Sequence, residues 1–277
     1  KRFPSSQKIS DSVKNIVEKY LSSNKLYDVD ETQNPYGFIG NMKKPFTILT
    51  WLASKSVPAS ASKEDSTAGY FFFETQKGFR YKSIDELIDQ DPHENKYTFT
   101  PGIVEYKGPD NDFKILEYST SRNQNLLENL ERGAYCSHRK YLNPLTFEYT
   151  PTPQTVFKLN DYSGKIKNLG GDIDVTLPTL SDNDNRTLAS VPSRYITGIL
   201  DIGTLENDVS TNENADPTKI HSQAMMRYNT LFTQILTMTI PLNTNLIAGD
   251  IINCEFPRID MEKKKGPDEI QSGLYMI

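Results

Sequence analysis

The segment Gly69–Ile88, GYFFFETQKGFRYKSIDELI, constrains the fold more than any other stretch of this chain. Large aromatic residues fill Tyr70–Phe73, which predicts a strand with bulky side chains on both faces. A short turn with glycine (QKG) follows, and Phe79–Lys82 then alternates aromatic and basic residues, as in the second strand of a hairpin. Ser83 and Glu86 have the spacing of a capping box, which predicts a short helix directly after the hairpin. Both faces of the first strand therefore need a cover of other residues.

Apolar residues at helical spacing predict further helices. The first carries its apolar stripe from Ile9 to Leu21, with Ser10 or Asp11 as the capping residue. Pro45 occupies a natural first position for the second helix. That second helix is expected to bury Phe46, Ile48, Leu49 and Leu52. A third helix is expected over 125–130, ending at Gly133 and burying Leu126, Leu127 and Leu130. A fourth is expected to begin at Asp216-Pro217 and to carry Ile220, Ala224 and Tyr228.

Alternating apolar and polar residues predict a half-buried strand over 232–240, with Phe232, Leu236, Met238 and Ile240 on one face and threonines on the other. The Gly and Asp residues at 249–250 predict a turn before the next strand. The other expected strands are 97–100, 113–118, 134–139 paired antiparallel with 145–150, 195–199, 251–256 and 272–277. Polar stretches at 58–67, 89–112, 151–185 and 205–214 are predicted to be loops, linkers or insertions outside the core.

Composition excludes several classes of protein. The net charge is -5 and basic residues are not clustered, which disfavours nucleic-acid binding because such binding needs grouped Lys and Arg. Two cysteines, Cys136 and Cys254, are too few for a disulfide framework or a zinc site, so buried free thiols are expected. No apolar run is long enough for a membrane span and no leader precedes the chain, so a soluble protein is expected. Lys1 and the strand pattern at the last residues predict a piece of a longer protein.

The sequence offers no set of residues with catalytic spacing. His93, His138 and His221 have no partner at metal or triad spacing, and Ser137 beside His138 would point to the opposite face of its strand. The acidic clusters at 110–112, 172–174 and 182–184 lack the glycine and glutamate of a calcium loop, and no phosphate-binding glycine motif occurs. The glycosylation sequon Asn185–Thr187 has little meaning without secretion. The lysine run 263–265 is expected at an exposed loop tip, with contact to an acidic partner as the alternative. We therefore predict no enzyme, no catalytic residue, no cofactor and no metal.

The aromatic residues leave two interpretations. Burial in a core or a subunit interface is the physical default for the hairpin rings. Alternatively, these rings would line a sugar or peptide groove that includes Phe71–Phe73, Phe79, Tyr81 and Trp51. In a carbohydrate-binding tail or receptor-recognition protein, Trp51 or Tyr81 would contact the glycan. A third and less favoured class is a cell-wall hydrolase, whose carboxylates can be distant along a chain.

The order of these features resembles the baseplate hub proteins of contractile-tailed, T-even-like bacteriophages. The similarity rests on PFTILTWLASKSV, the hairpin GYFFFETQKGFRYKSIDELI, ILEYSTSRNQNLLENLERGAYCSHRKYLNPLTFEYT, and RYNTLFTQILTMTIPLNTNLIAGDIINCEFP before SGLYMI. The closing LTMTIPLNTNLIAGDIINCEF is also similar to barrel strands of late control protein D and of the VgrG spike. Gly249, Asp250, Gly273 and Tyr275 match that pattern, at positions that are structural in the family.

The resemblance implies an α+β, β-rich fold with a small antiparallel β-barrel of the hub type. Residues 1–95 would form a helical and hairpin subdomain, and 96–277 the second hub barrel with loop and helix insertions, while the first barrel is missing from this chain. The family forms homotrimers in which two barrels per chain imitate a six-fold ring between the tail tube and a trimeric spike. The implied partners are sister copies, tail tube protein, the central spike or tail lysozyme, and baseplate wedge proteins. The resemblance places the chain in the virion, assembled in the bacterial host cytoplasm, where it would line the DNA passage without specific binding to nucleic acid or to a membrane.

Overall fold

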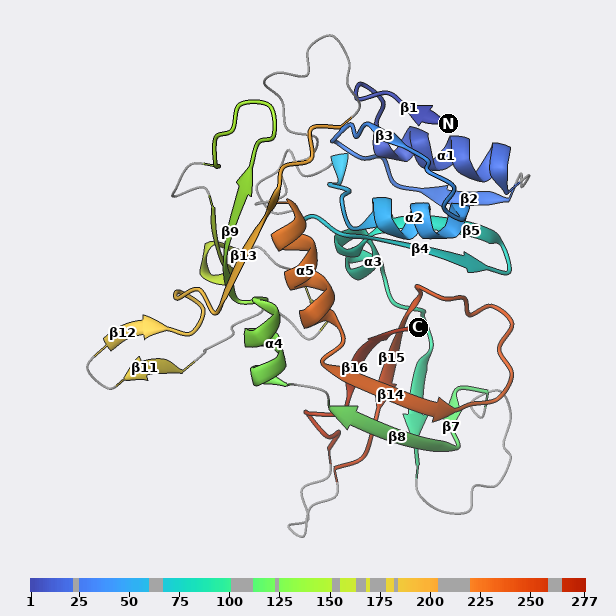
Figure 1. The fold of residues 1–277 in the computed structure, drawn as a ribbon. Coiled ribbons are helices and arrows are strands. Elements are labelled where there is room, and N and C mark those ends of the chain that lie inside the picture. Colours follow the sequence, from blue (N-terminus) through green and yellow to red (C-terminus); the bar gives the residue numbers. More distant parts are fainter. Residues whose placement is uncertain are drawn as a thin grey trace. The chain divides into compact units, whose positions relative to one another are not determined.

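The computed structural model describes residues 1–21, 25–59, 67–100, 112–122, 125–150, 155–162, 168–169, 178–181, 184–203, 220–258 and 266–277. These residues form a mixed structure of helices and strands (Figure 1). The helices are α1 (Ile9–Tyr20), α2 (Pro45–Ala53), α3 (Ile84–Asp89), α4 (Leu126–Arg132) and α5 (Ile220–Leu231), with a 3-10 turn at Leu159–Tyr162.

The strands fall into several small sheets rather than one large one. In chain order they are β1 (Arg2–Phe3), β2 (Leu26–Val29), β3 (Phe38–Ile39), β4 (Tyr70–Thr75), β5 (Gly78–Ser83), β6 (Lys96–Phe99), β7 (Lys114–Ile115), β8 (Glu117–Arg122), β9 (Cys136–Leu142), β10 (Val156–Lys158), β11 (Thr179–Ser181), β12 (Asp184–Thr187), β13 (Arg194–Ile199), β14 (Gln234–Thr239), β15 (Ile251–Glu255) and β16 (Gly273–Met276).

The chain divides into two compact units. The first unit comprises 1–85, 125–166 and 172–231, and the second comprises 86–124, 167–171 and 232–277. This division differs from the predicted one, in which all residues after 95 belonged to the barrel domain. The long stretch from 125 to 231 separates the paired strands β8 and β14 in the sequence, and it groups mainly with the N-terminal residues.

The N-terminal part of the first unit is built around the aromatic hairpin. Its strands β4 and β5 pair antiparallel as predicted, and β2 adds to β5 in parallel. Helices α1 and α2 contact each other, and they pack against β2 and β4 respectively. The shared core contains Phe3, Ile9, Val13, Ile16, Val17, Tyr36, Phe38, Ile48, Leu49, Leu52, Ala53, Tyr70, Phe79 and Tyr81. Tyr70, Phe79 and Tyr81 are therefore core residues, as the default interpretation predicted, whereas Phe71, Phe72 and Phe73 are only partly buried.

Both helix starts can be compared with the sequence prediction. Pro45 opens α2 as predicted, but neither Ser10 nor Asp11 caps α1, because the residue at the N-cap is Lys8 and its side chain makes no capping bond. Ser10 is buried inside the first turn, and its backbone N–H donates to the hydroxyl of Thr32 at 3.0 Å. A side chain from a neighbouring loop thus satisfies a donor that a local cap satisfies in most helices.

One prediction about α2 was wrong. Phe46 is 45% exposed, although Ile48, Leu49 and Leu52 are buried as expected. Its ring nevertheless packs against Phe72 and Phe79 at centroid distances of 5.5 and 5.8 Å. Phe46 therefore covers the outer side of the hairpin rather than filling the core.

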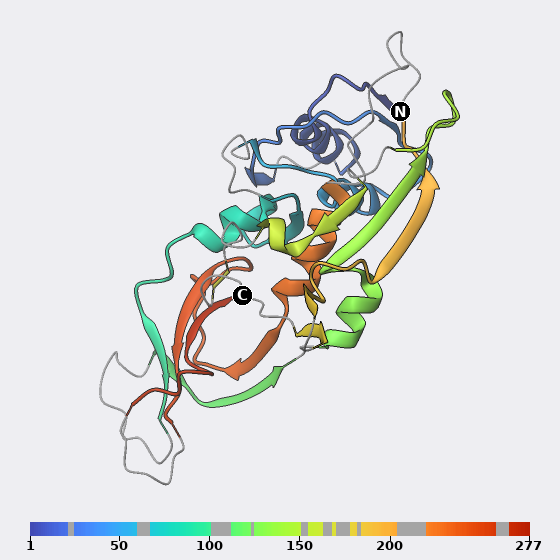
Figure 2. The same cartoon turned by 90° about the vertical axis from the view of Figure 1, so that its left-hand side faces the viewer.

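A second sheet in the first unit has the order β10-β9-β13. In Figure 2, β9 (green) and β13 (amber) run side by side, and they pair in parallel. The predicted antiparallel partner of β9, residues 145–150, forms no strand, although it turns back onto the end of β9. Tyr149 makes an antiparallel bridge to Leu142, and the N–H of Thr150 donates to the carbonyl of Tyr141 at 2.9 Å. The Asn143 side chain accepts the N–H of Leu145, and Phe147 takes a positive φ of 59°, so the residues after Asn143 form a turn before Tyr149.

The true antiparallel neighbour of β9 is β10. Phe157 in β10 and Leu159 after it are buried, so the prediction that the whole stretch 151–185 lies outside the core was wrong for the described residues 155–162. Strands β11 and β12 form a separate antiparallel pair.

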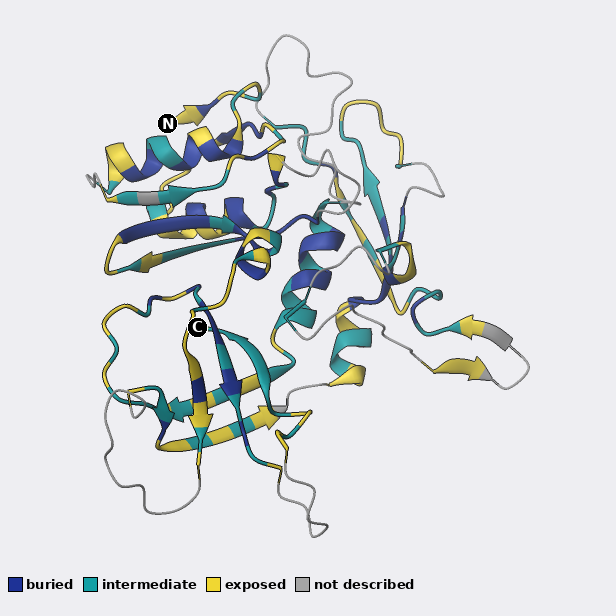
Figure 3. Cartoon of the chain, turned by 180° about the vertical axis from the view of Figure 1, so that it is seen from behind, coloured by how far each residue is buried: buried dark blue, intermediate teal, exposed yellow. Residues whose placement is uncertain are grey.

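Helix α4 ends as predicted, because Gly133 takes the left-handed conformation at φ 70°. Leu126 and Leu127, however, are 36% and 77% exposed, which contradicts their predicted burial. The helix has only seven residues. Of the three leucines that were predicted to be buried, Leu130 is the one that packs against the core. Helix α5 buries one side, the dark blue turns in Figure 3, which includes Ala224 as predicted. Its predicted start at 216–217 lies outside the described residues.

The second unit contains two small sheets, with the orders β16-β15-β6-β7 and β14-β8. β14 alternates as predicted, with Leu236 and Met238 turned inward, although Phe232 before it is 57% exposed. Figure 2 shows these strands curling around one core. That core contains Tyr97, Ile115, Ile252, Cys254 and Phe256, with Phe99, Phe113, Tyr118, Leu236, Met238, Ile240, Leu246 and Tyr275 packed against it.

One continuous segment takes part in both sheets. Phe113 accepts the N–H of Thr98 in the first sheet, and three residues later the N–H of Leu116 donates to Thr239 in the second. Leu116 separates β7 from β8, where the prediction had one uninterrupted strand over 113–118. The expected antiparallel arrangement is also incomplete, because β6 runs parallel to both β7 and β15. The sheets are mixed and, among the described residues, they form no closed barrel.

Candidate functional site

The first unit has a cavity of about 370 Å³ between the start of α2, β3 and the end of the strand that leads to Gly203. Its floor and walls are largely aromatic and aliphatic, while its mouth carries polar groups. The lining residues are Tyr36, Gly37, Phe38, Ile39, Asn41, Lys43, Ile48, Trp51, Asp201 and Gly203. The volume lies in the range of small-molecule sites, about 300–1,000 Å³.

Three rings build the apolar part of this cavity. Tyr36 and Phe38 are almost fully buried, whereas Trp51 is 36% exposed. Both buried rings meet Trp51 at an edge-to-face angle, with centroid distances of 5.3 and 5.6 Å. This geometry is the favoured one for aromatic pairs, so the position of the indole is fixed by its neighbours. Trp51 follows Ile48 by three residues, so both side chains lie on the same side of α2 and both line the cavity, whereas Leu52 is buried in the core.

A carboxylate stands at the polar side of the cavity. The hydroxyl of Tyr36 donates to Asp201 Oδ2, and the N–H of Gly203 donates to Asp201 Oδ1 at 2.9 Å. Burial, together with the hydrogen bond and the charge of Asp201, raises the pKa of Tyr36 far above its ordinary value. Tyr36 is therefore a neutral donor at every physiological pH, and it holds the carboxylate in one position.

Two lysines lie beside the same rings. Lys55 Nζ is 5.0 Å from the centroid of Tyr36 and 5.2 Å from that of Trp51, and Lys43 Nζ is 5.9 Å from Trp51. These distances are within the range of cation–π attraction. Burial lowers the pKa of Lys55, and the negative charge of Asp201 opposes that shift. The cavity thus brings one anionic and two cationic side chains to a largely aromatic surface.

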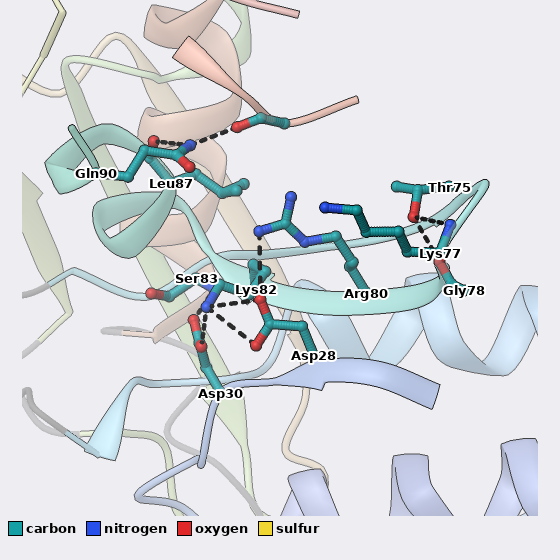
Figure 4. A network of polar contacts seen from close by, with 11 residues as sticks. Asp28, Asp30, Thr75, Lys77, Gly78, Arg80, Lys82, Ser83, Leu87 and Gln90 are labelled. Carbon is teal, nitrogen blue, oxygen red and sulfur yellow. Dashed lines mark hydrogen bonds and ion pairs between the residues drawn. The ribbon is translucent and has the colours of Figure 1, made fainter. Parts of the chain in front are cut away.

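A second polar cluster lies on the hairpin (Figure 4). Arg80 and Lys82 alternate with Phe79 and Tyr81 on β5, and Arg80 is only 7% exposed. Strand β2 places Asp28 and Asp30 beside them, with Lys82 Nζ 2.7 Å from Asp30 Oδ1 and Arg80 Nη2 3.2 Å from Asp28 Oδ2. Asp30 also accepts the backbone N–H of Ser83.

The charges in this cluster balance one another. Burial by itself lowers the pKa of Lys82, but the hydrogen bond to Asp30 and the charges of Asp30 and Asp28 outweigh burial, so this pKa is raised. All four groups are engaged with one another across two neighbouring strands. The arrangement fastens β2 to β5 and is a structural feature, not a reactive site.

The three histidines do not converge. His93 contacts the carboxylate of Asp250 at 3.1 Å, a pairing across 157 residues that no local pattern reveals. His138 contacts the hydroxyl of Thr155 at 3.0 Å, and Ser137 is fully buried with a different partner, Arg139.

His221 lies near positive charge. Burial, and then the charges of Arg139 and Lys55, lower the pKa of His221 to about 4. This histidine is neutral at pH 7.

The other candidate residues from the sequence have simple outcomes. Cys136 and Cys254 are buried free thiols, as predicted, and burial raises the pKa of Cys136 to about 11 and that of Cys254 to about 12. The clusters at 110–112, 172–174 and 182–184 lie wholly or mostly outside the described residues, as does the lysine run 263–265. The sequon lies on β12.

The carbohydrate-binding hypothesis named Trp51 and Tyr81. Tyr81 is completely buried and its hydroxyl pairs with Ser56 at 2.6 Å, so it cannot contact a ligand and that half of the hypothesis was wrong. Trp51 does line a cavity. Sequence reasoning missed Tyr36 and Asp201 because they are 165 residues apart and neither belongs to a recognisable motif.

Within the described part of the chain, no three His, Cys, Asp or Glu residues are grouped so that they could hold a metal ion. In the same residues, no helix has the length and apolar character needed to cross a membrane. No protein-family model matches this sequence, and a comparison with curated proteins gives no match either.

Proposed function

We propose that this chain is a structural subunit of a phage tail baseplate hub, which joins the tail tube to the central spike as part of a homotrimeric ring. The observation that carries the proposal is the second unit. Its two small sheets are joined by the continuous segment that carries β7 and β8, and they enclose one core. Strands β8, β14, β15 and β16 lie in segments on which the resemblance rests. An incomplete cylinder of this kind becomes a small barrel when its two edge strands, β14 and β16, come together.

The matching glycine and aspartate positions have structural roles that support this interpretation. Gly249 has a φ of 91° and its N–H donates to Ile277, while Asp250 accepts the N–H of Ile277 through its backbone and that of Ile247 through its side chain. Gly273 has a φ of 150°. The bonds of Gly249 and Asp250 connect the residues before β15 to the end of β16, and glycine adopts the φ values at 249 and 273 without strain.

The two edge strands already touch through side chains. Gln234 at the start of β14 donates to the hydroxyl of Tyr275 on β16 at 2.6 Å. Tyr275 is one of the positions that match the family pattern. This contact spans the seam across which the barrel of the proposal would close.

Charge adds a weaker argument. A wall that lines a DNA passage should not grip phosphate, and the net charge of -5 fits that requirement. In the second unit, the outward residues of β14 include Thr237 and Thr239 rather than basic residues.

Native mass spectrometry of the full-length protein, alone and with its tail tube or spike protein, tests the proposal. We expect a trimer in at least one of these mixtures. Ile235 is 47% exposed on the outer side of β14, so Ile235→Lys should weaken the trimer if this wall contacts a sister copy. Leu127→Lys, at a more exposed site on α4 in the first unit, is the matched control and should leave it intact. A protein that stays monomeric in every mixture would overturn the proposal.

A further inference from the structure

We infer that the cavity beside Trp51 is a binding site for an uncharged sugar ring. This site lies in the first unit and is independent of the hub function proposed above. It combines an aromatic surface that is partly open with a fixed hydrogen-bonding group and charges of both signs.

The aromatic part requires a ligand with an apolar face. Trp51 remains 36% exposed although its neighbours Tyr36 and Phe38 are almost completely buried. An exposed indole held rigidly by two other rings offers a flat surface whose π face is negative. The C–H groups on one side of a sugar ring carry a small positive charge, so they match such a surface, whereas a purely polar ligand would leave it unused.

The polar part requires hydroxyl groups. Asp201 is held in place by the Tyr36 hydroxyl and the Gly203 N–H, and its carboxylate can only accept hydrogen bonds. Lys43 can only donate, and the exposed amide of Asn41 does both. A hydroxyl group both donates and accepts, so a ring bearing several hydroxyls satisfies all three residues at once.

The charges exclude other classes of ligand. An anion at the mouth of the cavity would meet the Asp201 carboxylate, which is fixed by its hydrogen bonds. A cation would meet the ammonium group of Lys43, which lines the cavity, and that of Lys55, which lies close to the same rings. An uncharged ligand with an apolar face and a hydroxyl edge meets neither repulsion.

Saturation-transfer NMR with the intact protein tests this inference, because it reports which ligand protons contact the protein. The probes are glucose, galactose, N-acetylglucosamine and their β-linked disaccharides, compared with glucuronic acid and glucosamine as charged analogues of the same size. We expect saturable binding of at least one neutral sugar, with its strongest signals from ring C–H groups. Fluorescence of Trp51, the single tryptophan, should change over the same concentration range.

Three variants separate this site from nonspecific binding. Trp51→Leu and the rim variant Asn41→Ala should each weaken binding about tenfold or more, which corresponds to about 1.4 kcal/mol. Phe147→Ala removes an aromatic ring that is 78% exposed elsewhere in the first unit, and it should change nothing. Circular dichroism establishes that each variant is folded.

Two results would overturn the inference. One is the absence of saturable binding of any neutral sugar to the folded wild-type protein at millimolar concentration. The other is binding that both Trp51→Leu and Asn41→Ala leave unchanged. Neither result bears on trimer formation, so failure of this inference is distinguishable from failure of the hub proposal.

Discussion

Removing Asp30 should destabilise the first unit more than removing its partner Lys82. Asp30→Ala takes away the acceptor of the Ser83 N–H, a charge-assisted bond of 2.9 Å, and leaves Lys82 with Asp28 alone. Hydrogen bonds to charged groups contribute about 1.5–3 kcal/mol, and breaking a fully buried ion pair costs about 3–5 kcal/mol. The Asp30 and Lys82 side chains are 18% and 11% exposed, so we expect a loss of about 3 kcal/mol in the free energy of unfolding.

Lys82→Met should cost less, about 1 kcal/mol, because methionine keeps much of the buried stem while Asp30 still accepts the Ser83 N–H. The double variant should lose about 3 rather than 4 kcal/mol, which gives a coupling energy of about 1 kcal/mol. Asp30→Asn is the matched control, since its amide oxygen can still accept the Ser83 N–H, and its cost should fall between these values.

Urea unfolding followed by tryptophan fluorescence is a suitable assay, because Trp51 packs against the core of the same unit. It reports on this unit even if the second unit unfolds separately. A coupling energy of zero, or an Asp30→Asn variant as stable as the wild-type protein, would show that the ion pair does not fasten β2 to β5.

Three further outcomes are expected. Gly133→Ala should cost about 1–2 kcal/mol or more in thermal unfolding, because φ is 70° and a new Cβ would lie 2.9 Å from the Cβ of Arg194. Burial lowers the pKa of His221 from 6.5 to about 4, so the unfolded state takes up the proton first and stability is lost as pH falls from about 6.5 to 4. Urea unfolding at pH 7 and pH 4.5 measures this loss in the free energy of unfolding, and the loss should be smaller in His221→Gln. The difference should be at most about 3 kcal/mol, and less because the ring is only half-buried. Gln234→Leu should cost about 1 kcal/mol by removing the bond to Tyr275, and hydrogen exchange of the β16 amides should increase.

Local sequence patterns correctly predicted the elements whose conformation depends on residues close by in the sequence. The hairpin β4–β5 follows from its alternation and its turn, Pro45 begins α2, and Gly133 ends α4. At each of these positions the cause lies within a few residues of the effect, so the sequence contains the whole argument.

The failures occur where a distant residue decides. The expected capping side chain of α1 is absent because Thr32, from a neighbouring loop, satisfies the Ser10 N–H. The segment 145–150 has the alternation of a strand, yet β10 and β13 occupy both sides of β9. Alternation states only that a segment suits a sheet, and it does not say whether an edge is free to receive it.

The candidate site illustrates the same limit more strongly. Trp51 was recognisable as a ligand contact from its residue type, but Tyr81, chosen by the same criterion, is in the core. The two residues differ in their neighbours. Trp51 lines a cavity together with Asp201, which is distant in the sequence. Tyr81 is completely buried, and its hydroxyl is hydrogen-bonded to Ser56. An aromatic residue becomes a binding surface only when the fold leaves one face uncovered and brings a polar group to its edge. The residue type therefore suggests a ligand contact, but whether the side chain binds a ligand or packs in the core depends on residues that are distant in the sequence.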